Sequence, residues 1–209
     1  MITDIDQLDL SKKYTYADYL AWEFKERVEL IKGKVFKMSP APSDEHQRIS
    51  GAIHGVIWPF LRNNPCQVRH APYDVRLTIS NKVPISEKRK KTALPLPDDQ
   101  IETVVQPDIT VICDPGKIDK KGCMGSPDMV VEILSEGNNK ADVDEKFNIY
   151  QDAEVTEYWI VHPIEQTITV YTLENKKYIG SKPYTAGEAI HSQVLKGLAF
   201  EVAEVFPTP

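Results

Sequence analysis

The chain has 209 residues, which is enough for one domain with a well-buried core. Hydrophobic residues make up 41% of it and charged residues 27%, as in an ordinary globular protein. The net charge of −6 at pH 7 argues against a general nucleic-acid binder, whose affinity depends on many Lys and Arg contacts to phosphates. That charge does not exclude an enzyme with a local basic patch and an acidic metal site.

Cysteine usage and the apolar runs predict the compartment. The three cysteines, Cys66, Cys113 and Cys123, are odd in number and show no CxxC spacing, which favours buried or half-buried reduced thiols in a reducing compartment. No apolar run approaches the roughly 20 residues that cross a bilayer. The first residues are acidic and lack the basic-then-apolar order of a signal peptide. The sequence therefore predicts a cytoplasmic protein with no membrane segment.

The first third of the chain contains two predicted helices and a predicted hairpin. Thr15 followed by Asp18 predicts the capped start of a short helix. Apolar runs at 27–31 and 34–38 flank a Lys-Gly turn and predict a β-hairpin. Ser43 predicts the N-cap of a second helix, in which apolar residues spaced i, i+4, i+7 and i+8 form one core-facing side. These residues are Ile49, Ile53, Val56, Ile57, Phe60 and Leu61.

A polar segment interrupts the middle of the chain. Residues 68–77 have strand character with a break at Pro72. Residues 80–103 are polar, contain several prolines and are too long for an ordinary turn, so they predict a flexible insertion. This segment carries a basic cluster, which fits either a solvated loop or an arm that contacts DNA. The cluster consists of Lys88, Arg89, Lys90 and Lys91.

The second half of the chain alternates apolar runs of strand length with one helical segment. The predicted strands cover 108–113, 129–134, 157–162, 167–172 and about 177–179, and the predicted helix covers 142–153. In that helix Val143, Phe147 and Tyr150 mark the buried side. A short C-terminal stretch ends at Phe206. With no internal repeat and no linker, this order predicts a single α/β domain over 1–209, an α+β mixed sheet flanked by helices.

Two carboxylates stand out because of the strands that carry them. Asp108 begins one apolar strand, and Glu132 lies inside another, on the same face as Val130 and Leu134. A carboxylate in such a run is costly to bury unless it is paired or bound to a cation. A hard cation such as Mg²⁺ would relieve the repulsion of two adjacent carboxylates. An ion pair of Glu132 with a nearby Lys or Arg is the alternative that the residues alone leave open.

The order of residues carries a family resemblance. Pro107-Asp108 followed by the strand with Glu132 looks like the PD-(D/E)xK nuclease pattern, and the chain as a whole resembles the Uma2 family, also called DUF820. The match runs in register from about Tyr14 to Phe206. The segments that carry it are 14–20, 29–34, 38–40, 46–47, 71–77, 105–109, 127–135, 144–146, 157–161 with Pro163, and 195–198.

The resemblance implies a restriction-endonuclease-like fold and a divalent metal, Mg²⁺ or Mn²⁺, held by acidic residues. Asp108 matches the strand aspartate of the family, Glu132 matches its second acidic residue, and Glu29 matches an acidic position that assists at the site. The expected metal ligands are therefore Asp108, Glu132 and Glu29. The insertion at about 80–103 is longer than the family leads us to expect, so its basic cluster inherits no role.

One position departs from the nuclease pattern. In the ExK form, a lysine two residues after the glutamate orients the attacking water or stabilises developing charge. Here that position is Leu134, which does neither. Lys146 on the following helix is a candidate substitute, because a long side chain reaches a site from a neighbouring element. A surface ion pair with Asp142 or Asp144 is the other interpretation of Lys146, and Lys140 is a weaker candidate.

His46, at the start of the second predicted helix, is a candidate base or phosphate contact, with a capping or surface role as the alternative. The other histidines lack ligand spacing such as HExxH, and the sequence contains no Walker A, GxGxxG or GxSxG motif. The catalytic candidates are thus Asp108, Glu132, Lys146, Glu29 and His46.

Two functions from different classes follow. The first is a Mg²⁺-dependent endonuclease that hydrolyses phosphodiester bonds in DNA, with a homodimer as the expected assembly because related nuclease folds often cut both strands as dimers. The second is a catalytically inactive nuclease-fold domain that binds nucleic acid or protein, motivated by Leu134 and the acidic charge. Hydrolysis of another phosphoester, such as a nucleotide or RNA, is a third possibility.

Overall fold

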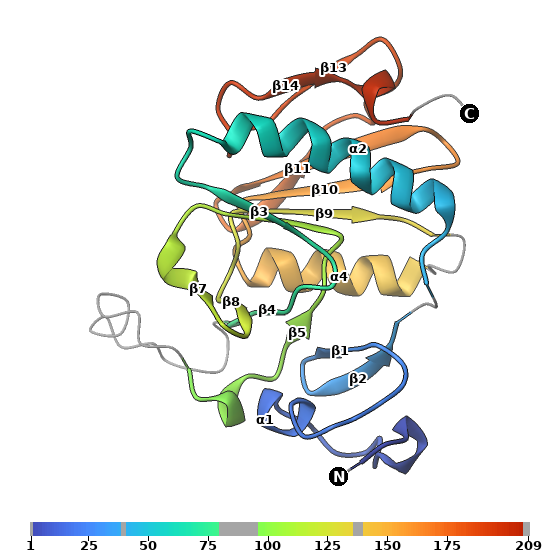
Figure 1. Ribbon diagram of the computed structural model, residues 1–209, viewed down its shortest axis with the longest axis vertical. Helices are drawn as coiled ribbons and strands as arrows, with labels where there is room; N and C mark the ends of the chain where they lie inside the picture. Colours follow the sequence, from blue (N-terminus) through green and yellow to red (C-terminus); the bar gives the residue numbers. More distant parts are fainter. Residues whose placement is uncertain (1, 39–40, 80–95, 136–139, 207–209) are drawn as a thin grey trace.

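The computed structural model describes residues 2–38, 41–79, 96–135 and 140–206. The strands in these ranges form two six-stranded sheets and one two-stranded sheet. The central sheet has the order β12-β11-β10-β9-β6-β3, and the N-terminal sheet has the order β2-β1-β5-β4-β8-β7. In Figure 1, α2 covers one face of the central sheet and α4 covers the other, with the N-terminal sheet on the α4 side. The predicted class, a mixed α+β fold flanked by helices, is confirmed.

The elements have the following bounds. The helices are α1 (Tyr16–Tyr19), α2 (Asp44–Leu61) and α4 (Lys140–Asp152), and the 3-10 turns are η1 (Ile5–Gln7), η2 (Asp98–Gln100), η3 (Pro115–Lys117) and η4 (Val202–Glu204). The N-terminal sheet comprises β1 (Val28–Ile31), β2 (Lys34–Lys37), β4 (Val75–Arg76), β5 (Val104–Val105), β7 (Ile118–Asp119) and β8 (Gly122–Met124). The central sheet comprises β3 (Gln67–His70), β6 (Ile109–Ile112), β9 (Met129–Ile133), β10 (Glu157–His162), β11 (Thr167–Glu174) and β12 (Lys177–Gly180), and β13 (Ala189–His191) pairs with β14 (Ala199–Glu201).

The N-terminal elements form as their local sequence predicts. The Thr15 side chain accepts from the backbone of Asp18, and the Asp18 carboxylate accepts from the backbone of Thr15, which is a complete capping box for α1. Strands β1 and β2 pair antiparallel from Val28 opposite Lys37 to Ile31 opposite Lys34. The turn between them needs positive φ at Lys32 (51°) and Gly33 (81°), which glycine adopts without steric cost.

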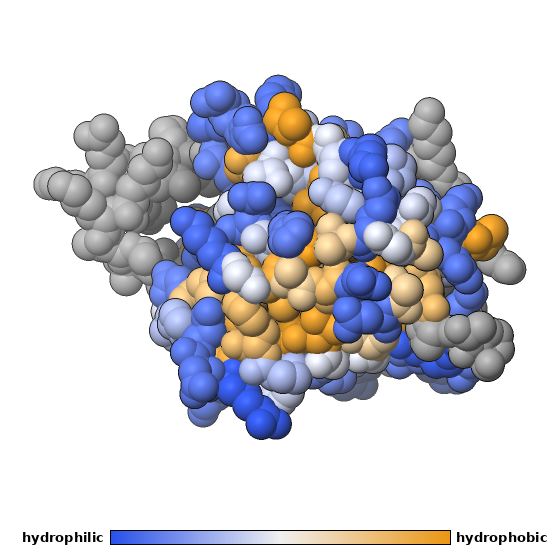
Figure 2. All heavy atoms as spheres, turned by 90° about the horizontal axis from the view of Figure 1, so that it is seen from above, coloured by the Kyte–Doolittle hydropathy of each residue, from blue (hydrophilic) through white to orange (hydrophobic). Residues whose placement is uncertain are grey.

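The helix α2 lies on one face of the central sheet because its apolar residues repeat along one side. Ser43 caps it by accepting from the backbone N–H of His46 at 3.2 Å. Ile49, Ile53 and Ile57 are at most 2% exposed and pack against inward residues of the sheet. Figure 2 views the molecule from above Figure 1 and shows a group of apolar residues on this face, surrounded by largely polar ones. The half-buried hydrophobic residues packed against this core are Ala52, Val56, Phe60, Cys113, Tyr184, Val194 and Phe206.

The other face of the central sheet packs on α4. Strands β9 and β10 are parallel, with Glu157 opposite Met129, so they need a crossover connection, and α4 supplies it. Tyr150 is fully buried in this second core, with Val143 and Phe147 half-buried against it. The predicted buried side of the helix is therefore confirmed.

The state of the cysteines differs from what the sequence predicts. Cys66 and Cys113 form a disulfide, so the prediction of three reduced thiols is wrong for this pair; Cys123 alone is a free, buried thiol. The antiparallel pairing of β3 with β6 brings the two cysteines together. Gln67 lies opposite Ile112, and Cys66 and Cys113 are the next residues beyond this pair. The argument from reduced thiols to a reducing compartment therefore loses its basis.

The predicted insertion at 80–103 falls partly outside the described residues, and so do Lys88, Arg89, Lys90 and Lys91. Its last part is described and is packed rather than loose. Residues 98–100 form η2, and Ile101 and Thr103 are 1% and 2% exposed. Within the described parts of the chain, no helix is long and apolar enough to span a membrane.

Candidate active site

Asp108 and Glu132 lie side by side at one end of the central sheet. Strands β6 and β9 are antiparallel with Ile109 opposite Val131, and the same register places Asp108 opposite Glu132. Residues opposite each other in a ladder point to the same face. The Asp108 Oδ2 atom accepts the backbone N–H of Ile133 at 2.8 Å, which fixes the aspartate against β9. The structure therefore brings together the two carboxylates that the sequence singles out.

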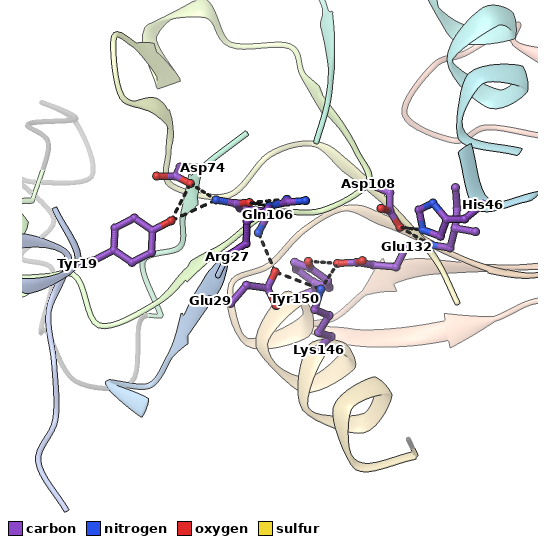
Figure 3. A network of polar contacts seen from close by, with 11 residues as sticks. Tyr19, Arg27, Glu29, His46, Asp74, Gln106, Asp108, Glu132, Lys146 and Tyr150 are labelled. Carbon is purple, nitrogen blue, oxygen red and sulfur yellow. Dashed lines mark hydrogen bonds and ion pairs between the residues drawn. The ribbon is translucent and has the colours of Figure 1, made fainter. Parts of the chain in front are cut away.

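Lys146 reaches these carboxylates from α4. Its Nζ lies 3.0 Å from Glu132 Oε1 and 3.2 Å from Glu29 Oε1, and only 19% of its side chain is exposed. These are partners in the interior and not the surface partners Asp142 or Asp144. The helix that follows β9 thus supplies the cation that Leu134 does not, as Figure 3 shows.

Glu29 comes from the other sheet. It lies in β1 and is 4% exposed. Its Oε1 accepts the backbone N–H of Gln106 at 2.8 Å in addition to the Lys146 contact. Glu29 and Glu132 are therefore joined through Lys146 Nζ across the space between the N-terminal sheet and the central sheet.

Tyr150 is a further contact of Glu132. One helical turn after Lys146, its hydroxyl donates to Glu132 Oε1 at 2.5 Å. Burial, together with the negative charge of Glu132, raises the pKa of Tyr150 well above its usual range, so the hydroxyl keeps its proton and remains a donor. Positions i and i+4 of a helix share one face, and that spacing of Lys146 and Tyr150 is the sequence signal that would have found this residue.

Burial and the neighbouring charges shift the pKa values of Glu132 and Lys146. Burial raises the pKa of Glu132 to about 7; Lys146 opposes that shift, while the carboxylates of Asp108 and Glu29 add to it. Burial favours the neutral amine of Lys146, but Glu132 and Glu29 outweigh it and raise the Lys146 pKa. The lysine therefore stays a cation at neutral pH, while the glutamate is poised to respond to any added positive charge.

His46 contacts the site through Asp108. At the start of α2, its Nε2 lies 3.2 Å from Asp108 Oδ2, and its side chain is 10% exposed. Burial favours the neutral ring, but the hydrogen bond and charge of Asp108 outweigh it and raise the pKa of His46. Its Nδ1 is buried and has no hydrogen-bond partner among the described residues. The ring holds the aspartate in place from the α2 side.

A pocket of about 180 Å³ opens over these residues. The residues that line it include Glu29, Asp108, Glu132, Lys146 and Arg27. Gln106, which immediately precedes Pro107-Asp108, also lines it. Gln106 and Arg27 were not among the residues singled out from the sequence. Arg27 alternates with Glu29 at i and i+2, a spacing that places both on one face of an extended strand.

The carboxylate oxygens at this pocket are of the type that coordinates a hard divalent cation. The contacts above use Asp108 Oδ2 and Glu132 Oε1, and the second oxygen of each carboxylate accepts no hydrogen bond from any residue that the structure describes. Mg²⁺ takes one or two protein carboxylates and completes its shell with water and phosphate oxygens. No group of three or more His, Cys, Asp or Glu side chains suited to a metal is found within the described ranges. The roles of Asp108, Glu132 and Glu29 as metal ligands thus stay predictions.

The fold and this cluster together define a class of protein: a restriction-endonuclease-like α+β fold with carboxylates paired on neighbouring strands at one end of the central sheet and a lysine that reaches them from α4. A family model for Uma2, described as "Putative restriction endonuclease", matches residues 16–203. The chain belongs to the Uma2 family.

Among solved structures, the chain is similar to the crystal structure of "a putative nuclease belonging to DUF820" from Anabaena variabilis, with a TM-score of 0.66 and 17% sequence identity. The similarity covers 92% of this chain and 97% of that chain, and at this identity it concerns the fold. No curated protein matches the chain.

Proposed function

We propose that this protein is a Mg²⁺- or Mn²⁺-dependent endonuclease that hydrolyses phosphodiester bonds in DNA. One observation carries the proposal: Lys146 Nζ lies 3.0 Å from Glu132, beside Asp108. A lysine on α4 therefore provides the positive charge that the nuclease pattern places at position 134, where this chain has leucine. Membership of a family described as "Putative restriction endonuclease" supports the same reaction class.

In this proposal the protein side chains divide the work. Asp108 and Glu132 would hold the ion, which supplies a water of lowered pKa and offsets charge on the phosphate. Lys146 orients the attacking water or stabilises the negative charge that develops on the phosphate oxygens. Glu29, itself fixed by the backbone N–H of Gln106, holds Lys146 in position. The water oxygen bonds to phosphorus as the bond to the 3′ oxygen breaks, and the proton that the water loses passes through solvent to the leaving 3′ oxygen.

The remaining expectations are part of the same proposal. His46 acts on Asp108 and not as the base, because its Nε2 is directed at the carboxylate. We propose a homodimer in which two such sites cut the two strands; light scattering of the purified protein tests the dimer. The cytoplasmic location stays a proposal, and the Cys66–Cys113 disulfide, of a kind that is rare in that compartment, counts against it.

The experiment is a plasmid-cleavage assay with a calorimetric Mn²⁺ titration. Wild-type protein is expected to nick or linearise plasmid in Mg²⁺ or Mn²⁺ but not in EDTA, and to bind Mn²⁺. Asp108→Asn and Glu132→Gln are expected to lose both properties. The proposal fails if wild-type protein cuts no DNA in either metal and Asp108→Ala alters neither Mn²⁺ binding nor thermal stability.

A second candidate function has its own observation. Lys146 pairs with Glu29 and Glu132 together, which is also what an inactive domain would use to neutralise two buried carboxylates. A nuclease-fold domain that only binds nucleic acid or protein would then need no metal. Absence of Mn²⁺ binding by wild-type protein, together with retained DNA binding, would favour this candidate.

A further inference from the structure

Arg27 is a cation at the pocket that is held by a neutral partner. It directly precedes β1 and is exposed, and it lines the same pocket as Glu29 and Glu132. Its Nε and Nη2 both donate to Gln106 Oε1, at 3.0 and 2.5 Å. Arg27 pairs with no carboxylate in the part of the chain that the structure describes, so no described side chain neutralises its charge.

The neighbouring cations at this pocket differ in this respect. Lys37, which also lines it, pairs with Glu26 at 2.8 Å. Lys146 pairs with two glutamates. The pocket otherwise presents several carboxylates, which repel a polyanion. A substrate phosphate therefore needs an unpaired cation, and Arg27 is placed to supply it.

The amide of Gln106 fixes the orientation of this guanidinium. Gln106 Nε2 donates to Asp74 Oδ1 at 2.8 Å and to the Tyr19 hydroxyl at 3.1 Å, so the amide is held at both ends. Arginine has five N–H donors, and Gln106 Oε1 engages two of its nitrogens through one N–H each, which leaves three N–H groups. Such a pre-oriented fork matches the oxygens of a phosphate group.

We infer that Arg27 is a phosphate-binding residue, and that it contacts the substrate phosphate next to the one at which hydrolysis occurs. It lies two residues from Glu29 along an extended chain, which is a separation of roughly 7 Å, so it is beside the carboxylate cluster and not within it. Gln106 joins the two places, because its side chain orients Arg27 while its backbone N–H holds Glu29. The inference rests on the proposed function, since it assumes a phosphodiester substrate.

The test is the salt dependence of DNA binding. Binding of a fluorescein-labelled DNA duplex is followed by anisotropy in constant Ca²⁺, which takes the same kind of oxygen ligands, over a series of NaCl concentrations. Gel analysis after each titration checks that the duplex is intact. Loss of one phosphate contact lowers the slope of log Kd against log salt by about 0.9. We expect that change for Arg27→Gln, no change in slope for Arg27→Lys, and none for the control Arg62→Gln, another exposed arginine.

The outcomes separate this inference from the proposed function. Mn²⁺ binding and melting temperature of Arg27→Gln are measured alongside, and values like those of wild type show that the Gln106 network persists. An unchanged slope for Arg27→Gln overturns the inference alone, because Arg27 would then only support Gln106. Failure of wild-type protein to bind duplex DNA, single-stranded DNA or RNA overturns the proposed function and the inference together.

Discussion

Lys146 carries its charge in a setting where most lysines would lose it. Burial favours the neutral amine, yet two glutamates within 3.2 Å hold the proton on Nζ. The same pairing makes the residue costly to replace, because removing one member of a buried ion pair leaves the others uncompensated. The role of this lysine can be separated into chemistry and stability by substitution.

Lys146→Met removes the charge and keeps much of the side-chain volume. We expect cleavage to fall about 10²–10³-fold, the size of effect seen when a stabilising group at the reacting centre is lost. The free energy of unfolding in EDTA is expected to fall by about 3 kcal/mol. Lys32→Met is the control, since Lys32 pairs with Glu145 at the surface and such a pair is worth about 1 kcal/mol or less. Equal effects of the two substitutions would contradict the role given to Lys146.

Tyr150 provides a second test at the scale of one residue. Tyr150→Phe removes the hydroxyl that donates to the Glu132 carboxylate, and a hydrogen bond to a charged group contributes about 1.5–3 kcal/mol. Tyr178→Phe is the matched control, because the Tyr178 hydroxyl donates to the neutral carbonyl of Val155. Such a bond contributes about 0.5–1.5 kcal/mol. Urea unfolding above pH 8, where Glu132 with its pKa of about 7 is ionised, should therefore show the larger loss for Tyr150→Phe, and the reverse order would count against a charged Glu132.

At the scale of elements, an ion pair links β4 to β7 across β8 in the N-terminal sheet. Arg76 is 1% exposed, and its Nη2 donates to Asp119 Oδ1 at 2.6 Å. Burial favours the protonated Asp119, but the hydrogen bonds from Arg76 and from the backbone of Lys121 outweigh it and lower its pKa. The buried guanidinium thus depends on a partner that is half exposed.

The sign of the pH effect follows from that lowered pKa. A carboxyl group whose pKa is depressed on folding stabilises the protein above its ordinary pKa, here 3.8, and this contribution disappears as the pH falls through the folded value. Asp119→Asn keeps an acceptor but removes the charge, which we expect to cost about 1 kcal/mol at pH 7, reduced by solvent screening. Urea unfolding of both proteins between pH 7 and 3 should show the difference shrinking toward acid. A difference that is independent of pH would contradict this account.

The whole molecule contains three cysteines in two chemical states. Cys123 is buried, and burial raises the pKa of its thiol to about 12, so it should not react with Ellman's reagent in the native protein. Denaturation without reductant should expose one thiol per chain, and denaturation with reductant followed by its removal should expose three, because Cys66 and Cys113 are joined. Three reactive thiols without reductant would show that the pair is open.

Local structure was the part most accessible from the sequence. The hairpin around Gly33 and the capped α2 follow from neighbouring residues, and the burial of Glu132 on the face of Val130 follows from strand alternation. Pairings between distant segments were less accessible, because they depend on strand order and register. Cys66 and Cys113 illustrate this, since they are 47 residues apart and meet only through β3 and β6.

In the candidate site, too, features that depend on neighbouring residues were predictable and contacts between distant segments were not. The apolar strands singled out Asp108 and Glu132, and the resemblance to Uma2 gave them roles and added Glu29. Lys146 was a candidate because Leu134 broke the expected pattern. The parts played by Gln106 and Tyr150 arise from contacts between β1, the loop before β6, and α4. No local pattern encodes those contacts, although the i, i+4 spacing of Lys146 and Tyr150 indicates a shared face.

The bridge from Glu29 through Lys146 to Glu132 joins two sheets that share no backbone ladder among the described strands. Thermodynamic linkage then couples ligand binding at Glu132 to the docking of the β1–β2 hairpin, and each affects the other equally. A ligand that alters the charge of Glu132 alters the free energy with which the β1–β2 hairpin docks on the rest of the molecule. Conversely, a substitution that loosens the hairpin weakens ligand binding at the carboxylate cluster without contacting it. The affinity of the cluster for a ligand therefore depends in part on strands that lie outside the central sheet.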